Sequence, residues 1–204
     1  MSAFSPLCEV AAGNGYWAAL LRARGADVNA CDVRPPADGK GFCPVAKAGP
    51  EYLETPAGRD RNLFLCYPDQ EADSVALSCL QKFVGEFVVC AGEEFAGGTK
   101  NMRAAPFGRS CNPEFQEALA TDFHCVLRLD LPCHPLAQDT LTVWKRTAKT
   151  TIVYGGDDDD DEPAPDGDGD DEDDVDHYAY VPEEERIPLD AAAPFLKHLL
   201  ERKS

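Results

Sequence analysis

The chain has 204 residues, 44% of them hydrophobic, and a formal net charge of −18. This length and apolar content allow one sizeable core and exclude a wholly disordered chain. Residues 157–176 hold 14 of the 37 acidic residues and no Lys or Arg, so the other 23 acidic residues are set against 19 basic ones. The body is therefore only weakly acidic, and without a basic patch it does not indicate a nucleic-acid partner.

A strand, a helix and a second strand are predicted at the start of the chain. Apolar residues 6–11 form the first strand, and residues 15–24 form a helix that Gly25 ends. Residues 27–32 are the second strand, which ends in the carboxylate of Asp32. This succession is the beginning of an α/β sheet.

The turn after the first strand has the features of a nucleoside site. Gly13 and Gly15 allow a sharp turn and a close approach of the backbone to a ligand. The helix that opens at Tyr16 directs N–H groups and the positive end of its dipole toward that ligand. Asp32 can accept both hydrogen bonds of a ribose diol.

Further strands and helices alternate along the chain. A loop with two prolines spans residues 34–41, and Asn112 and Pro113 provide the cap and first residue of a helix that ends near residue 121. The other predicted elements are a short strand at 45–48, a buried strand at 62–68, a helix at 71–83 and a strand at 86–91.

Two strands close the body, at residues 124–130 and 140–145. The loop between them is too short for a crossover helix, so they must pair antiparallel. The sequence therefore predicts a mostly parallel sheet that ends in an antiparallel C-terminal hairpin.

Two cofactor motifs fit the same glycines. Residues 13–18 match G-x-G-x-x-A, the dinucleotide fingerprint, and Asp32 follows at about the right distance. Residues 9–15 match E-x-[GA]-x-G-x-G, which resembles the first motif of class I S-adenosylmethionine-dependent methyltransferases. Glu9 separates the two, because its carboxylate would repel a pyrophosphate but favour the cationic methionine part of S-adenosylmethionine.

The resemblance to this family extends over residues 6–146 and, with the terminal hairpin, implies a Rossmann-like three-layer α/β sandwich. Residues 62–68 stand where many N-methyltransferases carry [DN]-P-P-[YF], which holds the acceptor, so Tyr67 and Pro68 are the implied substrate-binding residues. The residues that the resemblance assigns to S-adenosyl-L-methionine are Glu9, Ala11, Gly13, Asn14, Gly15, Tyr16, Asp32, Val33, Glu51 and Cys66, with Glu51 near the adenine.

Several of these residues have a plain structural alternative. The glycines can serve only a tight turn, Asp32 can pair with Arg34, Glu9 can cap the first helix and Tyr67 can pack in the core. Trp17 and Trp144 are expected in the core. Other side chains indicate no metal site, because the histidines lack ligand spacing, and the cysteines within apolar runs are expected to be buried thiols: Cys8, Cys31, Cys66, Cys90 and Cys125.

The predicted organisation has three parts. Residues 1–154 form the methyltransferase-like domain, residues 155–176 a disordered acidic linker, and residues 177–204 a segment with an amphipathic helix that docks on the body or on a partner protein. The reduced cysteines and the lack of a signal peptide or membrane span indicate a cytoplasmic protein.

Three functions remain open. The first is a methyltransferase that uses S-adenosyl-L-methionine and acts on an unknown acceptor. The second is a non-catalytic methyltransferase-like module that works through its acidic linker and C-terminal helix, since only about six residues precede Leu7 and no lid precedes the first strand. The third is an NAD-dependent oxidoreductase.

Overall fold

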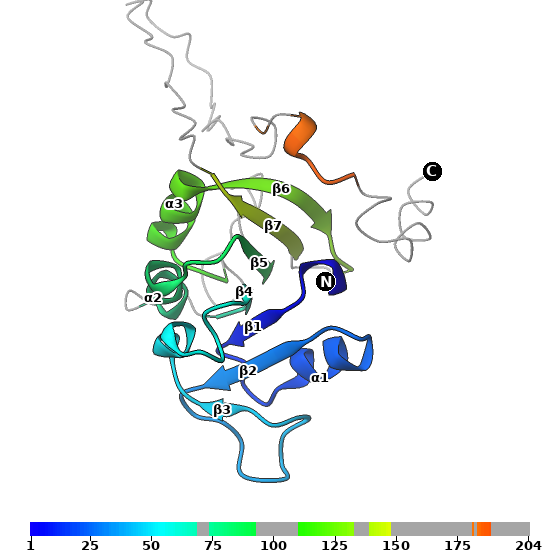
Figure 1. Ribbon diagram of the computed structural model, residues 1–204, viewed down its shortest axis with the longest axis vertical. Helices are drawn as coiled ribbons and strands as arrows, with labels where there is room; N and C mark the ends of the chain where they lie inside the picture. The colour runs from blue at the N-terminus through cyan, green and yellow to red at the C-terminus, as the bar shows by residue number, and fades with distance from the viewer. Residues whose placement is uncertain (69–73, 93–109, 133–138, 148–180, 182, 189–204) are drawn as a thin grey trace, which may run out of the picture.

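The computed structural model describes residues 1–68, 74–92, 110–132, 139–147, 181 and 183–188. Its centre is a seven-stranded sheet in the order β3-β2-β1-β4-β5-β7-β6 (Figure 1). The strands are β1 (Leu7–Val10), β2 (Val28–Asp32), β3 (Ala46–Lys47), β4 (Asn62–Cys66), β5 (Phe87–Gly92), β6 (Phe123–Asp130) and β7 (Thr140–Arg146).

The strand directions confirm the predicted fold class. Strands β1 to β5 pair in parallel, whereas β7 pairs antiparallel with both β5 and β6. The hairpin places β7 between β5 and β6, so the last strand of the chain's body lies inside the sheet. The result is a Rossmann-like α/β sheet that is mostly parallel and ends in an antiparallel pair.

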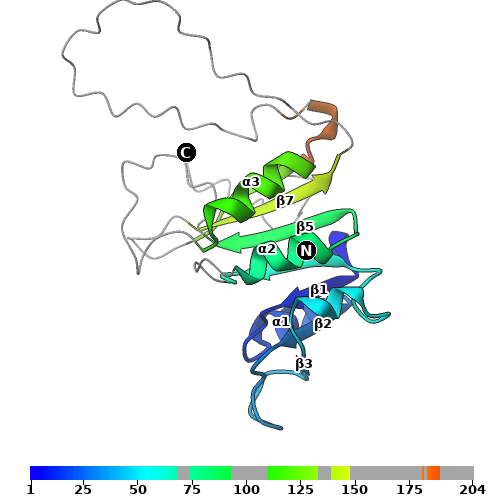
Figure 2. The same cartoon turned by 90° about the vertical axis from the view of Figure 1, so that its left-hand side faces the viewer.

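Helices cover both faces of this sheet. On one face α1 (Tyr16–Ala23) packs through Ala18 and Leu21. On the other face lie η2 (Pro50–Glu54), α2 (Val75–Lys82) and α3 (Pro113–Asp122), with α2 and α3 nearest the viewer in Figure 2. Each face therefore has its own apolar core, as a parallel sheet requires.

The helix caps follow from local sequence. The Asn112 side chain accepts a hydrogen bond from the Phe115 N–H at 3.0 Å, and Pro113 is the first helical residue, as predicted. Helix α2 begins after Ser74, whose hydroxyl accepts from the Leu77 N–H at 3.1 Å, so its described part is shorter than the predicted helix.

The two tryptophans differ in environment. Trp144 is buried between the sheet and the helices, as expected. The prediction for Trp17 was wrong, because 46% of this side chain is exposed. The buried stripe of α1 is Ala18 and Leu21, and Trp17 lies about 100° away from Ala18 around the helix. It packs instead edge-on against Tyr16 at the surface.

The connection between β2 and β3 has no helix or strand over residues 33–45. It forms the loop below β3 in Figure 1 and folds back onto the turn after β1, since the Phe42 N–H donates to the Asn14 carbonyl at 2.9 Å. The predicted strand at 45–48 is real but only two residues long.

Residues beyond the acidic tract pack on the last strand of the sheet. Val181 is buried, the Ile187 N–H donates to the Val126 carbonyl at 2.7 Å, and Glu185 contacts the His124 ring at 3.1 Å. The acidic linker at 155–176 and the apolar helical stripe from Leu189 onward lie outside the described residues.

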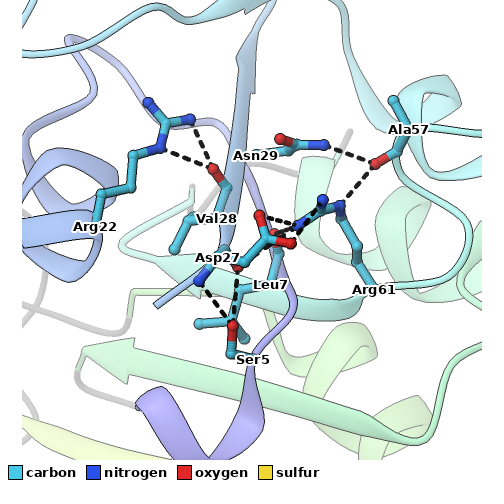
Figure 3. A network of polar contacts seen from close by, with 8 residues as sticks. All are labelled: Ser5, Leu7, Arg22, Asp27, Val28, Asn29, Ala57 and Arg61. Carbon is cyan, nitrogen blue, oxygen red and sulfur yellow. Dashed lines mark hydrogen bonds and ion pairs between the residues drawn. The ribbon is translucent and has the colours of Figure 1, made fainter. Parts of the chain in front are cut away.

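A polar network joins the amino ends of β1, β2 and β4 (Figure 3). Arg61 binds both carboxylate oxygens of Asp27 at 2.9 and 3.1 Å, and also donates to the carbonyls of Ala57 and Leu7. Arg22 donates twice to the Val28 carbonyl, at 2.8 and 2.7 Å. These bonds fasten the sheet at the end opposite to the glycine turn.

We expect Arg61→Ala to lower the free energy of unfolding by about 1–3 kcal/mol, because it removes charge-assisted bonds from a largely buried guanidinium. Lys82→Ala is the matched control, since Lys82 forms an exposed ion pair with Glu54 and its loss should leave stability within experimental error. Urea unfolding measures both variants, and an equal effect of the two would contradict a structural role for the network.

Candidate functional site

The turn after β1 has a backbone in the left-handed region at three positions. The φ angles are 59° at Ala11, 54° at Gly13 and 75° at Gly15. Gly15 is the N-cap of α1, and the Tyr16 N–H donates to the Asn14 side chain at 3.3 Å. A non-glycine residue such as Ala11 is strained in this region, and such strain is concentrated at functional sites.

The two glycines have different surroundings. A Cβ on Gly15 would lie 2.8 Å from a Val45 methyl and 2.9 Å from the Cys43 sulfur. A Cβ on Gly13 would meet nothing within 4 Å. Gly15 is therefore needed for packing against the β2–β3 loop, whereas Gly13 borders open space in which a ligand can approach the backbone.

Asp32 connects the turn to β2. Its Oδ2 accepts from the Gly13 N–H at 2.8 Å, and its Oδ1 accepts from the Arg34 N–H at 2.7 Å. The structure thus brings Asp32 and Gly13 together, and the contact with Arg34 is to its backbone. Each carboxylate oxygen keeps a second lone pair, which leaves Asp32 able to accept from a ribose hydroxyl.

Glu9 is a buried acid on β1, with only 2% of its surface exposed. Its partners in the strand register are Ala30 on β2 and Phe64 on β4, both apolar and buried. Burial raises the pKa of Glu9 to about 7, although the Ala18 N–H and the charge of Arg22 lower it. A hydrogen bond from Ala18 caps α1, but it leaves Oε2 without a partner among the described residues.

The two residues assigned to the adenine side lie close together. Glu51 opens η2, is exposed, and accepts from the Gly49 N–H at 2.7 Å, which holds the pKa of this carboxyl below its usual range. A Cβ on Gly49 would contact both Glu51 and Val33. Val33 follows Asp32 directly and is 53% exposed.

The residues assigned to the acceptor lie after β4. Cys66 is half-buried at the end of this strand, Pro68 is half-buried, and Tyr67 is 49% exposed, so Tyr67 does not pack in the core. Tyr67 has a φ of 48°, its N–H donates to the Ala91 carbonyl at 3.1 Å, and its hydroxyl donates to the Asp139 carboxylate.

Asp139 was not identified from the sequence. A signal for it exists in the hairpin, because β7 pairs antiparallel with β5 and so brings Thr140 opposite Gly92. The residue before Thr140 then lies beside the end of β5, next to the end of β4. The antiparallel pairing alone would have indicated a side chain from this position at the acceptor side.

The remaining polar side chains add no metal centre within the described residues, where no group of three or more His, Cys, Asp or Glu could hold an ion. Four of the five cysteines in apolar runs are buried as predicted, and Cys66 is half-buried. Among the helices described here, none is long and apolar enough to cross a membrane.

No family model and no curated protein matches the sequence. Among solved structures, the chain is similar to the 1,6-didemethyltoxoflavin-N1-methyltransferase of Burkholderia thailandensis with bound 1,6-didemethyltoxoflavin and S-adenosylhomocysteine. The identity is 17%, the TM-score is 0.47, and the match covers 69% of this chain and 70% of that one.

A second similar structure is a point mutant of the 16S rRNA (adenine(1408)-N(1))-methyltransferase from Catenulisporales acidiphilia, with the cosubstrate SAM. The identity is 10%, the TM-score is 0.40, and the match covers 74% of this chain and 89% of that one. Both TM-scores are below 0.5, so the fold assignment rests on the strand order of the sheet.

Alanine at the two glycines should separate packing from ligand access. Both positions have positive φ, so each substitution costs about 1–2 kcal/mol of strain. We expect Gly15→Ala to cost about 1–3 kcal/mol more, because its Cβ overlaps Val45 and Cys43. Urea unfolding compares the two variants, and equal losses would contradict the assigned packing role of Gly15.

Glu9→Gln should stabilise the protein in a pH-dependent way. The pKa of Glu9 is raised from 4.5 to about 7, so the folded state holds its proton where the unfolded state has lost it, and stability falls as pH rises through this window. The neutral amide escapes this loss. We expect a gain of about 1 kcal/mol at pH 5 and about 3 kcal/mol at pH 8, measured by urea unfolding. An equal gain at both pH values would contradict the raised pKa.

Proposed function

We propose that the protein is an S-adenosylmethionine-dependent methyltransferase that transfers a methyl group to an acceptor bound at Tyr67 and Pro68. The observation that carries this proposal is the buried carboxylate of Glu9 beneath the glycine turn, with one oxygen unpartnered among the described residues. A diphosphate beside this group would meet like charge in a region of low dielectric, whereas a cation would be attracted. This sign of charge favours a methionine part over a dinucleotide.

The strand order supports the same position for the cofactor. The order reverses between β1 and β4, and ligands of open α/β sheets bind outside the carboxyl ends of the strands at such a switch point. The glycine turn follows β1, Asp32 ends β2 and Cys66 ends β4, so all three border this point.

The residues at this edge fit the cofactor. In our proposal Asp32 binds the ribose, Val33 and Glu51 border the adenine, and the open side of Gly13 admits the ligand to the backbone. The remaining assigned residues lie on the methionine side: Glu9, Ala11, Asn14, Gly15, Tyr16 and Cys66.

S-adenosylmethionine supplies a methyl group that is already activated by a sulfonium. The chain's own contribution is then mainly alignment of the acceptor, which can account for much of a barrier reduction. Tyr67 is held for this purpose by two bonds, its N–H to Ala91 and its hydroxyl to Asp139. Such a fixed aromatic ring at the end of β4 can orient a planar or N–H-bearing acceptor.

A second candidate function is a non-catalytic module that acts through its acidic linker and C-terminal helix, with a protein as partner. It is favoured by the packing of Val181 and Ile187 against the sheet, which fixes the chain to the body just after the acidic tract. For either function a reducing compartment such as the cytoplasm suits the buried thiols.

Calorimetry with S-adenosylhomocysteine tests the proposal. We expect binding to the intact chain and an affinity about 10–100-fold weaker in Asp32→Asn, because the ribose would lose a charge-assisted hydrogen bond. Asp60→Asn, an exposed acid outside the site, should bind like the unaltered chain.

No binding at millimolar S-adenosylhomocysteine would refute the proposal. A fluorescence titration with NADH in parallel distinguishes the oxidoreductase, and tighter binding of NADH than of S-adenosylhomocysteine would contradict the methyltransferase. If the chain binds the cofactor but no methyl transfer to any acceptor is found, the second candidate function is favoured.

A further inference from the structure

Glu9 has no counter-ion in the described structure. On the two strands beside β1 its register partners are the apolar residues Ala30 and Phe64. On α1 the Ala18 N–H and the charge of Arg22 act on it. The guanidinium of Arg22, however, makes both of its described hydrogen bonds to the Val28 carbonyl, so this nearby cation is held away by another group.

An acid in this position is uncommon, since charged side chains are rarely buried without a partner. The capping of α1 requires only one oxygen, and a neutral amide would serve that purpose without the cost of a buried charge. The second oxygen, Oε2, has no partner among the described residues and is therefore available for a group that a ligand provides.

We propose that Glu9 ionises when the site takes up a ligand with a primary ammonium group, and that it thereby selects ligands with a methionine end over ligands with adenosine alone. This inference rests on the proposed function for the position of the ligand. On binding, the carboxylic acid gives its proton to the solvent, and the ammonium group keeps its own protons. The pair is then a carboxylate and an ammonium ion, in contact or through one water.

The pKa of the free protein supports this coupling. With a value of about 7, Glu9 is mostly protonated at pH 6 and mostly ionised at pH 8. A ligand that requires the ionised form loses affinity as the pH falls. We expect the affinity for an ammonium ligand to rise about tenfold from pH 6 to pH 8, and the complex to release close to one proton at pH 6.

Two probes separate the ammonium group from the nucleoside. S-adenosylhomocysteine and 5′-methylthioadenosine share the adenosine and the thioether, but only the first carries the amino-acid end. Calorimetry in two buffers of different ionisation enthalpy gives the number of protons released by each ligand at pH 6 and pH 8. The intact chain is compared with Glu9→Gln and with Glu86→Gln, an exposed acid at the start of β5.

For the unaltered chain and Glu86→Gln, we expect proton release and tenfold pH dependence with S-adenosylhomocysteine and neither effect with 5′-methylthioadenosine. Glu9→Gln should bind 5′-methylthioadenosine normally, which shows that its site is folded, and should bind S-adenosylhomocysteine more weakly and without proton release.

Binding of S-adenosylhomocysteine without proton release, or an unchanged release in Glu9→Gln, would overturn the inference while the proposed function stands. If neither probe binds the unaltered chain, the proposed function fails and this inference fails with it.

Discussion

The carboxylate of Asp32 is the interaction on which the site depends. Through Gly13 at 2.8 Å and Arg34 at 2.7 Å it joins the turn after β1 to the loop that leaves β2. Because Gly15 ends the same turn and caps α1, this bridge also fixes where the helix begins. The loop returns over the turn through Phe42, so the bridge is enclosed on one side and open beside Gly13. A ribose would add to this bridge rather than build a new one.

The two ends of the sheet are used differently. At the amino ends, Arg61 and Asp27 are fully engaged in hydrogen bonds, and nothing in their geometry invites a ligand. At the carboxyl ends lie a strained Ala11, a strained Tyr67 and the buried acid Glu9, whose Oε2 has no partner in the described part of the chain. Each of these lowers stability, and their grouping at one edge is expected where function constrains the chain. The sheet is thus stabilised at one end and adapted for binding at the other.

Local signals account for what could be predicted from the sequence. The cap at Asn112 and Pro113, the glycine turn and the tight hairpin depend on neighbouring residues, and they were predicted correctly. Trp17 was placed in the core because apolar residues surround it in sequence, but the helix turns it outward. Asp139 is an ordinary loop acid until the antiparallel pairing brings it to Tyr67. The environment of the Glu9 carboxyl depends on burial by two neighbouring strands, which no local pattern reports.

The account states that the glycine turn, Asp32 and Glu9 together hold one nucleoside with a cationic end. A crystal structure of the chain with S-adenosylhomocysteine tests this most directly. We expect the ribose hydroxyls within hydrogen-bonding distance of Asp32 and the amino group on the side of Glu9, in contact with Oε2 or with a bridging water. A ligand bound away from Gly13, or bound in the site with its amino group turned from Glu9, would contradict the account.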